Sequence, residues 1–148
     1  MNLPHSYQVN ISWRQDRVGL LSASGIPTTF EVATPPPFPG GVGRTWSPEH
    51  LFTAAVNSCF MTTFLAIAEN SRLSFDAFEC AAAGDLDLVE GRYRMTRVTL
   101  RPTLIIANHA DEAKALRVLE KAEQACLITN SINATVSLQP TVQVTKPA

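Results

Sequence analysis

An uncharged segment, residues 51–68, constrains the fold more than any other part of the chain. Only Asn57, Ser58 and three threonines interrupt its apolar character. Residues 47–49 read Ser-Pro-Glu, which gives a helix a hydroxyl N-cap, a proline at its first position and an acid in its first turn. The sequence therefore predicts a buried helix, because a helix without a charged face belongs in a core. No uninterrupted apolar run reaches the ~18 residues that a membrane span needs.

This predicted helix also carries a stripe of small residues at i, i+4 spacing. Small side chains let another backbone approach closely, so we expect a second helix to pack on the stripe. A chain of 148 residues with mostly short strands does not readily cover such a helix, and we expect an obligate homodimer. The stripe consists of Ala55, Cys59, Thr62 or Thr63, and Ala66.

The order of the predicted elements indicates an α+β fold in one domain, residues 1–148, because strands and helices are partly segregated along the chain. Alternating residues predict strands over residues 7–13, 18–22 and 28–32. A loop with four prolines and three glycines follows at residues 34–46, and it is either a surface connector or a functional loop. After the first helix we expect a long hairpin at 73–106, a helix at 110–125 and a last strand at 134–144. Pro140 splits that strand and suggests an edge position.

The hairpin has a predicted register. Glu90-Gly91 can form a two-residue turn, which sets Asp87 opposite Arg94 and Leu88 opposite Tyr93. The apolar parity shifts further along the second strand, so a β-bulge is expected near Thr96.

Composition excludes several classes of protein. The formal net charge is −1, so no basic excess draws the chain to nucleic acid or to a membrane surface. The first ten residues lack the basic and apolar regions of a signal peptide, and we expect a cytoplasmic protein. Three cysteines are too few and odd in number for a disulfide framework. Neither His50 nor His109 stands at ligand spacing from a cysteine, so we expect no metal site, and we expect no cofactor.

The chemistry of the chain depends on its cysteines. Cys59 is predicted in the middle of the apolar helix, and Cys126 at the end of the second helix on its inward face, where the two sulfurs could be neighbours. A thiol with only apolar neighbours has a raised pKa and is inert. Spacing alone leaves two inert core cysteines as an open alternative. Cys80, in an alanine-rich strand, is expected to be a structural thiol.

Two motifs resemble the OsmC/Ohr (organic hydroperoxide resistance) family. Residues 47–60, SPEHLFTAAVNSCF, resemble the family's helix with a Pro-Glu pair before its peroxidatic cysteine, and Glu49 stands ten residues before Cys59. Residues 126–131, CLITNS, resemble the second signature, and the glycine-rich residues 40–43 also match. Ohr members usually have proline where this chain has Leu127. The chain is therefore similar to the broader OsmC-like branch.

The resemblance implies a fold and a reaction. It implies an intertwined homodimer whose antiparallel sheets wrap two central helices per chain. It further implies that the Cys59 thiolate reduces an organic hydroperoxide and becomes a sulfenic acid, and that Cys126 resolves it as a disulfide. The partners would be the peroxide and a dithiol reductant, either a lipoyl protein or a small thiol, with no nucleic acid and no membrane. Aromatic side chains would line an apolar pocket: Phe38, Trp46, Phe52 and Phe60.

The resemblance also implies an arginine beside Cys59, held by Glu49, although Glu49 could merely complement the helix dipole. Arg17 is favoured because it lies at the mouth of the turn between the first two predicted strands. Arg44 and Arg14 are the other candidates. An alternative function from another class is a non-catalytic dimer that binds a small apolar or acyl ligand in the same pocket.

Overall fold

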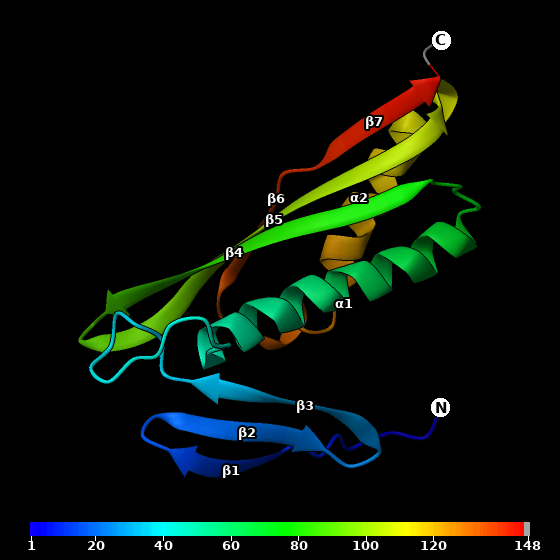
Figure 1. Ribbon diagram of the computed structural model, residues 1–148. Helices are drawn as coiled ribbons and strands as arrows, with labels where there is room; N and C mark the ends of the chain where they lie inside the picture. The colour runs from blue at the N-terminus through cyan, green and yellow to red at the C-terminus, as the bar shows by residue number, and fades with distance from the viewer. Residues whose placement is uncertain (147–148) are drawn as a thin grey trace. The chain divides into compact units, whose positions relative to one another are not determined.

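The computed structural model describes residues 1–146, which form seven strands, two α-helices and two short 3-10 helices (Figure 1). The chain forms two compact units, Met1–Leu51 and Phe52–Ala148, which are described separately below. The predicted α+β class is confirmed. The strands pair with one another in two sheets, and paired strands stand between the two α-helices along the chain. The single-domain assignment of residues 1–148 stays a prediction.

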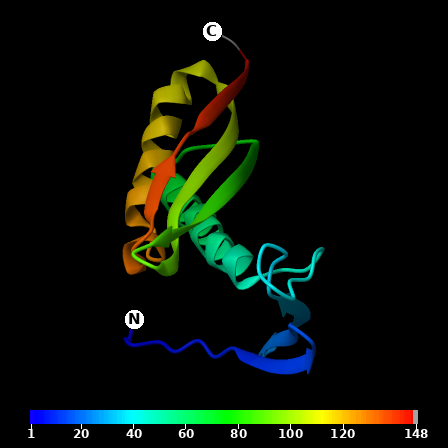
Figure 2. The same ribbon diagram turned by 90° about the vertical axis from the view of Figure 1, so that its left-hand side faces the viewer.

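The first unit is built on a three-stranded antiparallel meander (Figure 2). Its strands are β1 (Asn10–Gln15), β2 (Val18–Ala23) and β3 (Ile26–Ala33). All three were expected, but the predicted start of the first at residue 7 is wrong. Tyr7 and Val9 precede β1, because β2 ends at Ala23 and the pairing of the two strands stops at Asn10 and Ser22.

The proline- and glycine-rich loop, residues 34–46, is held by its own backbone. Val42 N–H donates to the carbonyl of Thr34, and Gly41 N–H donates to the carbonyl of Phe38. At the base of the loop, Ala33 N–H donates to the carbonyl of Trp46. These bonds close the loop directly before Ser47, the residue that precedes the first helix.

Helix α1 (Pro48–Asn70) begins where the sequence predicts. Ser47 caps it in a reciprocal pair with His50: the Ser47 hydroxyl oxygen accepts from His50 N–H at 3.2 Å, and His50 Nδ1 accepts from Ser47 N–H at 3.1 Å. This is the arrangement of a capping box with a histidine in place of the usual Glu or Gln. Sequence reasoning missed this use of His50.

The second unit contains the predicted hairpin, β4 (Ala77–Val89) and β5 (Arg92–Asn108). Its register is the predicted one, with Asp87 opposite Arg94 and Leu88 opposite Tyr93. Glu90 and Gly91 both have positive φ, as a two-residue hairpin turn requires. The pairing skips Thr96, because Asp85 faces Arg97 and Leu86 faces Met95, so the expected bulge is confirmed.

The other edge of β5 is covered by the last part of the chain. After the 3-10 helix η1 (His109–Asp111), helix α2 (Glu112–Ala125) leads to a second 3-10 helix, η2 (Thr129–Ser131). Strands β6 (Thr135–Leu138) and β7 (Thr141–Lys146) then pair with β5 in parallel. Pro140 separates them, and the predicted edge position is confirmed.

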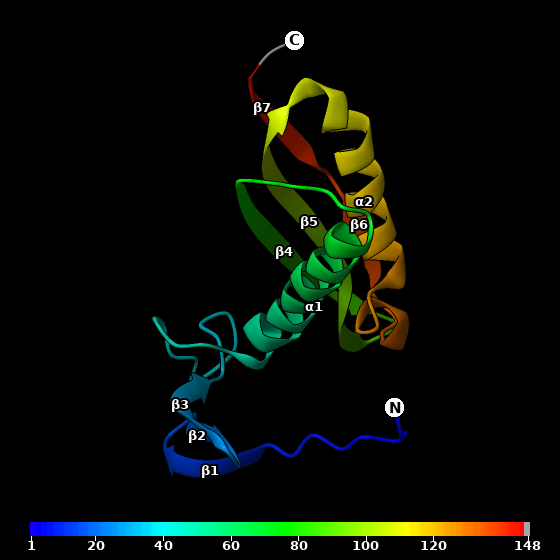
Figure 3. The same cartoon turned by 90° about the vertical axis from the view of Figure 1, so that its right-hand side faces the viewer.

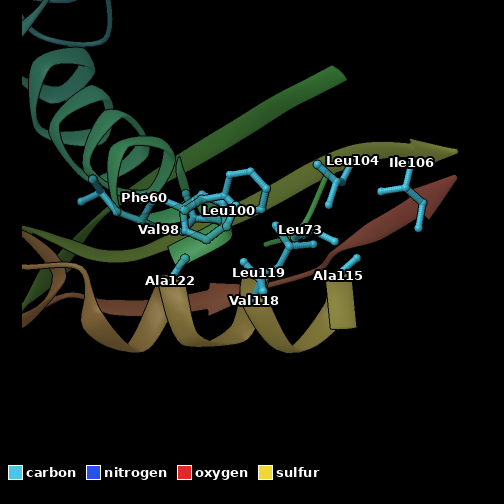
Figure 4. Packing of buried hydrophobic residues seen from close by; sticks show 13 residues of the cluster. Phe60, Leu73, Val98, Leu100, Leu104, Ile106, Ala115, Val118, Leu119 and Ala122 are labelled. Carbon is cyan, nitrogen blue, oxygen red and sulfur yellow. The ribbon is translucent and has the colours of Figure 1, made fainter. Parts of the chain in front are cut away.

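The core of the second unit lies between the β4–β5–β6/β7 sheet and both helices, which cover the same face of that sheet (Figure 3). Alternate residues of β5 point into it, and α1 and α2 meet them from the other side (Figure 4). Gly84 on β4 gives α1 room, because a side chain there would collide with Thr53. The fully buried members include Val56, Phe60, Phe64, Val98, Leu100, Leu104, Ile106, Ala115, Leu119 and Ala122.

The single chain covers α1 on one side. Members of its small-residue stripe differ: Cys59 is buried beside the end of α2, whereas Thr62 and Ala66 are exposed, so the stripe does not make the main core contact. The larger residues Val56, Phe60 and Phe64 do so, because they fill the space beneath the sheet. The chain alone does not cover the helix all round, as expected: Met61 and Leu65 on its opposite face are 39% and 42% exposed, and their burial in a homodimer stays a prediction.

By length and composition, α1 could cross a membrane, although its polar residues interrupt every apolar run. It is the one such helix among the described residues. The core helix of a soluble protein has the same properties. The expectations of a cytoplasmic protein with no membrane partner stay predictions.

Candidate functional site

The candidate site lies where the middle of α1 meets the end of α2, and all of its elements belong to the second unit. Cys59 is 9% exposed and Cys126 is fully buried. Cys126 directly follows α2 and has an extended backbone, φ −63° and ψ 115°, so the chain leaves the helix axis at this residue. It then turns back through Leu127 and Ile128, and Asn130 N–H donates to the carbonyl of Cys126 at 3.1 Å.

The structure brings the two sulfurs together, as the inward-face positions suggested. Burial on its own raises the pKa of Cys59, because desolvation penalises the thiolate. Hydrogen bonds to the sulfur outweigh that effect, and the pKa lies below the ordinary value of a cysteine. The donors are, in order of effect, Ile128 N–H, the Cys126 thiol, the Thr63 hydroxyl and Leu127 N–H.

Cys126 has the opposite character. Burial raises the pKa of its thiol, and the neighbouring Cys59 raises it further, because a thiolate there attracts the Cys126 proton and repels a second charge. Thr129 opposes these effects from the following turn. The Thr129 hydroxyl is buried, and apart from this sulfur it has no partner among the residues that the structure describes.

The opposite pKa shifts of the two thiols give Cys59 and Cys126 different chemical properties. The pKa of Cys59 is lowered and that of Cys126 is raised, so Cys59 gives up its proton more readily than Cys126 does. Such a pair has one nucleophile and one adjacent sulfur that can form a disulfide with it. An inert buried thiol lacks donors such as those at Cys59; the redox roles of Cys59 and Cys126 stay predictions.

Cys80 provides the contrast within the same unit. It lies on β4 opposite Pro102 and is partly buried. Burial raises the pKa of its thiol to about 11, and a single backbone hydrogen bond from Arg101 only partly opposes this. A thiol of this kind is protonated near neutral pH, which agrees with the structural role expected for Cys80.

Glu49 and Arg17 belong to the first unit, and their roles at Cys59 stay predictions. Glu49 is in the first turn of α1. Arg17 is in the turn between β1 and β2, as expected, and its side chain lies across Gly40, where a β-carbon would come within 2.9 Å of the Arg17 Nε. Arg17 also lines a cleft of about 400 Å³ with Ile11 and Trp13.

The other arginine candidates are placed differently. Arg14 falls at a bulge between β1 and β2, where the pairing skips it. Arg44 is exposed in the glycine-rich loop with a positive φ of 59°.

One expected lining residue is misplaced. Phe60 is fully buried against Phe78 in the core of the second unit, so it does not line a pocket. Trp46 is half exposed and packs instead near Phe30 and His50 in the first unit. The prediction for Phe60 is wrong because its helix position faces the sheet together with Phe64.

Sequence reasoning also missed three of the groups around Cys59. Thr63 stands four residues after Cys59, which places it on the same helix face, and that spacing was a usable signal. The backbone N–H groups of Leu127 and Ile128 left no such signal, because their direction depends on how the chain turns after α2.

Comparison with known proteins agrees with this fold. The model of the family described as OsmC-like protein matches residues 41–141, which includes both cysteine motifs. The chain belongs to the OsmC-like family. Its relative YmaD of Bacillus subtilis, an uncharacterized protein, is 24% identical over 140 residues, which is 91% of each chain.

Solved structures share the fold across nearly the whole chain. An OsmC-like protein of unknown function from Vibrio cholerae has a TM-score of 0.83 and 23% identity, with 93% of this chain and 99% of that chain covered. An organic hydroperoxide resistance protein from Elizabethkingia anophelis has a TM-score of 0.75 and 19% identity, with 97% and 99% covered. The fold is thus shared with a protein named for organic hydroperoxide resistance.

Proposed function

We propose that the protein is a cysteine-based peroxidase that reduces organic hydroperoxides to alcohols. The observation that carries the proposal is the pair of neighbouring sulfurs with opposite pKa shifts: hydrogen-bond donors lower the pKa of Cys59, whereas the pKa of Cys126 is raised. Membership of a family that includes organic hydroperoxide resistance proteins supports the choice of substrate class.

The proposed first step is nucleophilic. The Cys59 thiolate attacks the distal oxygen of the hydroperoxide, so that an S–O bond forms while the O–O bond breaks. The departing alkoxide takes up a proton and leaves as the alcohol, and Cys59 becomes a sulfenic acid. The sulfur has been oxidised and the peroxide reduced, without a metal or a cofactor.

The second step uses Cys126. Once it loses its proton, the Cys126 sulfur attacks the Cys59 sulfenic acid; an S–S bond forms, the S–O bond breaks, and the hydroxide leaves as water after protonation. An external dithiol, a lipoyl protein or a small thiol, then reduces the disulfide and restores both thiols. This step requires little movement, because the two sulfurs are already neighbours.

In this proposal Arg17 serves Cys59 by lowering its pKa and polarising the peroxide, and Glu49 holds the guanidinium group. The position of Arg17 in a turn, beside an apolar cleft, supports this choice over Arg14 and Arg44. The aromatic residues Phe38, Trp46 and Phe52 then favour organic peroxides over hydrogen peroxide, without the contribution first expected from Phe60.

We further propose that the protein works as a homodimer. Each unit has apolar side chains that the chain itself leaves uncovered: Trp13 is 75% and Ile11 65% exposed in the first unit, and Leu65 is 42% exposed on α1 in the second. Burial of such side chains is the main favourable contribution to most associations. A folded, active monomer at micromolar concentration, as measured by light scattering, would contradict this proposal.

The second candidate, a dimer that binds an apolar or acyl ligand without catalysis, is favoured by one observation. The first unit contains a cleft of about 330 Å³ with an almost wholly apolar lining, which includes Leu21, Ile26 and Phe30. A binding protein of this kind would take up the ligand without any change in its thiols.

Steady-state peroxide consumption tests the proposed function. The protein is mixed with dihydrolipoamide and either cumene hydroperoxide or hydrogen peroxide, and the remaining peroxide is measured over time. We expect catalytic turnover with at least a tenfold preference for the organic peroxide. Consumption no faster than with dihydrolipoamide alone would refute the peroxidase and leave the binding function.

A further inference from the structure

Thr63 directs its hydroxyl at the reacting sulfur rather than at the backbone. The distance between Thr63 Oγ1 and Cys59 Sγ is 3.8 Å, within the range of a hydrogen bond to sulfur, and the two residues stand four apart on α1. Side chains at i and i+4 of a helix are neighbours on one face. The contact therefore depends on the geometry of a single helix.

The adjacent Thr62 shows that this orientation is not the default for a helical threonine. Its hydroxyl donates to the backbone carbonyl of Cys59 at 3.1 Å, which is a common local bond for threonine in a helix. Thr62 is exposed, whereas Thr63 is partly buried beside the sulfur. Two neighbouring threonines thus contact the same cysteine, one at its carbonyl and the other at its thiol.

We propose that Thr63 is a catalytic residue of the peroxidase, whose hydroxyl donates a hydrogen bond to the Cys59 thiolate and keeps that sulfur ionised for attack. This proposal rests on the proposed function for its catalytic meaning, but the hydrogen bond itself does not depend on the substrate. A hydrogen bond to the charged form of a group favours that form.

Thr63 differs from the other donors in where it comes from. Leu127, Ile128 and Cys126 all belong to the segment around the end of α2, and Cys126 stops donating when it loses its proton to attack the sulfenic acid. Thr63 is fixed to Cys59 by one turn of α1. Its hydroxyl is thus held beside the sulfur independently of the segment around the end of α2.

The pH dependence of Cys59 alkylation tests this inference. Only the thiolate reacts with iodoacetamide, so the rate below the pKa follows the ionised fraction. Thr63→Val removes the hydroxyl and keeps the shape of the side chain. We expect it to shift the alkylation profile upward by about half a pH unit to one, which lowers the rate near neutral pH about three- to tenfold.

The matched variants separate a hydroxyl effect from a packing effect. Thr63→Ser should restore the wild-type profile, whereas Thr63→Ala, which differs from it only by the hydroxyl, should behave like Thr63→Val. Thr62→Val should leave the profile unchanged. All variants carry Cys80→Ser and retain Cys126, and peptide mass spectrometry assigns the label to Cys59.

Equal profiles for wild type and Thr63→Val would overturn the inference, as would an equal shift in Thr63→Ser and Thr63→Ala. If Thr63→Val does not fold, the Ser and Ala pair decides the question alone. The alkylation assay contains no peroxide. A failure here leaves peroxide consumption by the wild-type protein as a separate result, and inactivity of that protein leaves the alkylation profiles interpretable.

Discussion

Two regions of the second unit hold a cysteine away from water, and they shift its pKa in opposite directions. On β4, Cys80 is partly buried in a sheet whose backbone groups are engaged with neighbouring strands, and its pKa rises to about 11. Where α1 meets the end of α2, burial also acts to raise the pKa of Cys59, yet the pKa falls. Burial alone therefore does not set the direction of the shift.

The difference lies in the number of donors that point at each sulfur. A strand interior commits its N–H groups to the ladder, so that Cys80 gains one backbone hydrogen bond. A chain that turns directly after a helix has N–H groups free of a ladder, and those of Leu127 and Ile128 point at Cys59. In this chain, the turn after α2 thus supplies Cys59 with donors that the strand interior does not supply to Cys80.

The largest expected effect comes from removing the sulfur of Cys59, and removal of the Cys80 sulfur serves as its control. Cys59→Ser should reduce peroxide consumption to below a few per cent of wild type, because a serine hydroxyl is a far weaker nucleophile at neutral pH. Cys80→Ser is the matched control and should retain nearly full activity. Steady-state assays with cumene hydroperoxide measure both, and similar activities for the two variants would invalidate the comparison.

Cys126→Ser should stop turnover but spare the first step. The variant should rapidly reduce one peroxide per chain, since Cys59 is intact; because no thiol resolves the sulfenic acid, a second equivalent of peroxide then slowly oxidises it to sulfinic acid. Quantification of the alcohol product and mass spectrometry of the Cys59 peptide report these outcomes. If the variant cycles normally on dihydrolipoamide, Cys126 is not the resolving thiol.

Arg17→Ala should raise the pKa of Cys59 by about one unit or more, because an opposite charge within ~4–6 Å shifts a pKa by about 1–3 units. The readout is the pH dependence of Cys59 alkylation in a Cys80→Ser, Cys126→Ser background. Arg44→Ala is the control and should leave the profile in place. The reverse pattern would assign the role to Arg44.

Leu127→Pro tests whether the turn after α2 lowers the pKa of Cys59 through the Leu127 N–H. Proline removes the Leu127 N–H, and the extended backbone of Cys126 is one that a residue before proline favours. We expect a rise in the pKa of Cys59 that slows alkylation at neutral pH about two- to threefold, because this donor has the smallest effect of the four. Leu127→Ala keeps the N–H and should match wild type; a slower reaction in both would indicate a packing effect instead.

The smallest effect concerns the region around Cys80. Its folded pKa, about 11, lies above the ordinary value of 9.0, so the folded state binds this proton more tightly than the unfolded state. The associated stability is present below pH 9 and is lost as the pH rises toward 11. With allowance for partial exposure it amounts to about 1 kcal/mol. Urea unfolding between pH 8 and 11 should show a shallower decline in Cys80→Ser, and identical slopes would contradict the shift.

Much of the fold followed from local patterns in the sequence. The Ser47 cap and the Glu90-Gly91 turn are strong signals that act over a few residues, and the parity change at Thr96 located the bulge. The same local reasoning failed for Phe60. An all-apolar helix does not reveal by periodicity which side meets the sheet.

The candidate site was only partly predictable for a similar reason. The motifs around Cys59 and Cys126 identified the two sulfurs, whose meeting across the fold was a reasonable expectation. The donors from Leu127 and Ile128 depend on the backbone direction after α2, which the side chains at those positions do not encode. Only Thr63, fixed by helical spacing, was open to sequence reasoning.

The most direct test of the account is a thiol count after one equivalent of cumene hydroperoxide. The three cysteines are free thiols before treatment. If Cys59 and Cys126 are the redox pair, two thiols per chain should disappear, and peptide mapping should recover a Cys59–Cys126 disulfide with Cys80 still free. No loss of thiols, or a disulfide that contains Cys80, would contradict the central claim.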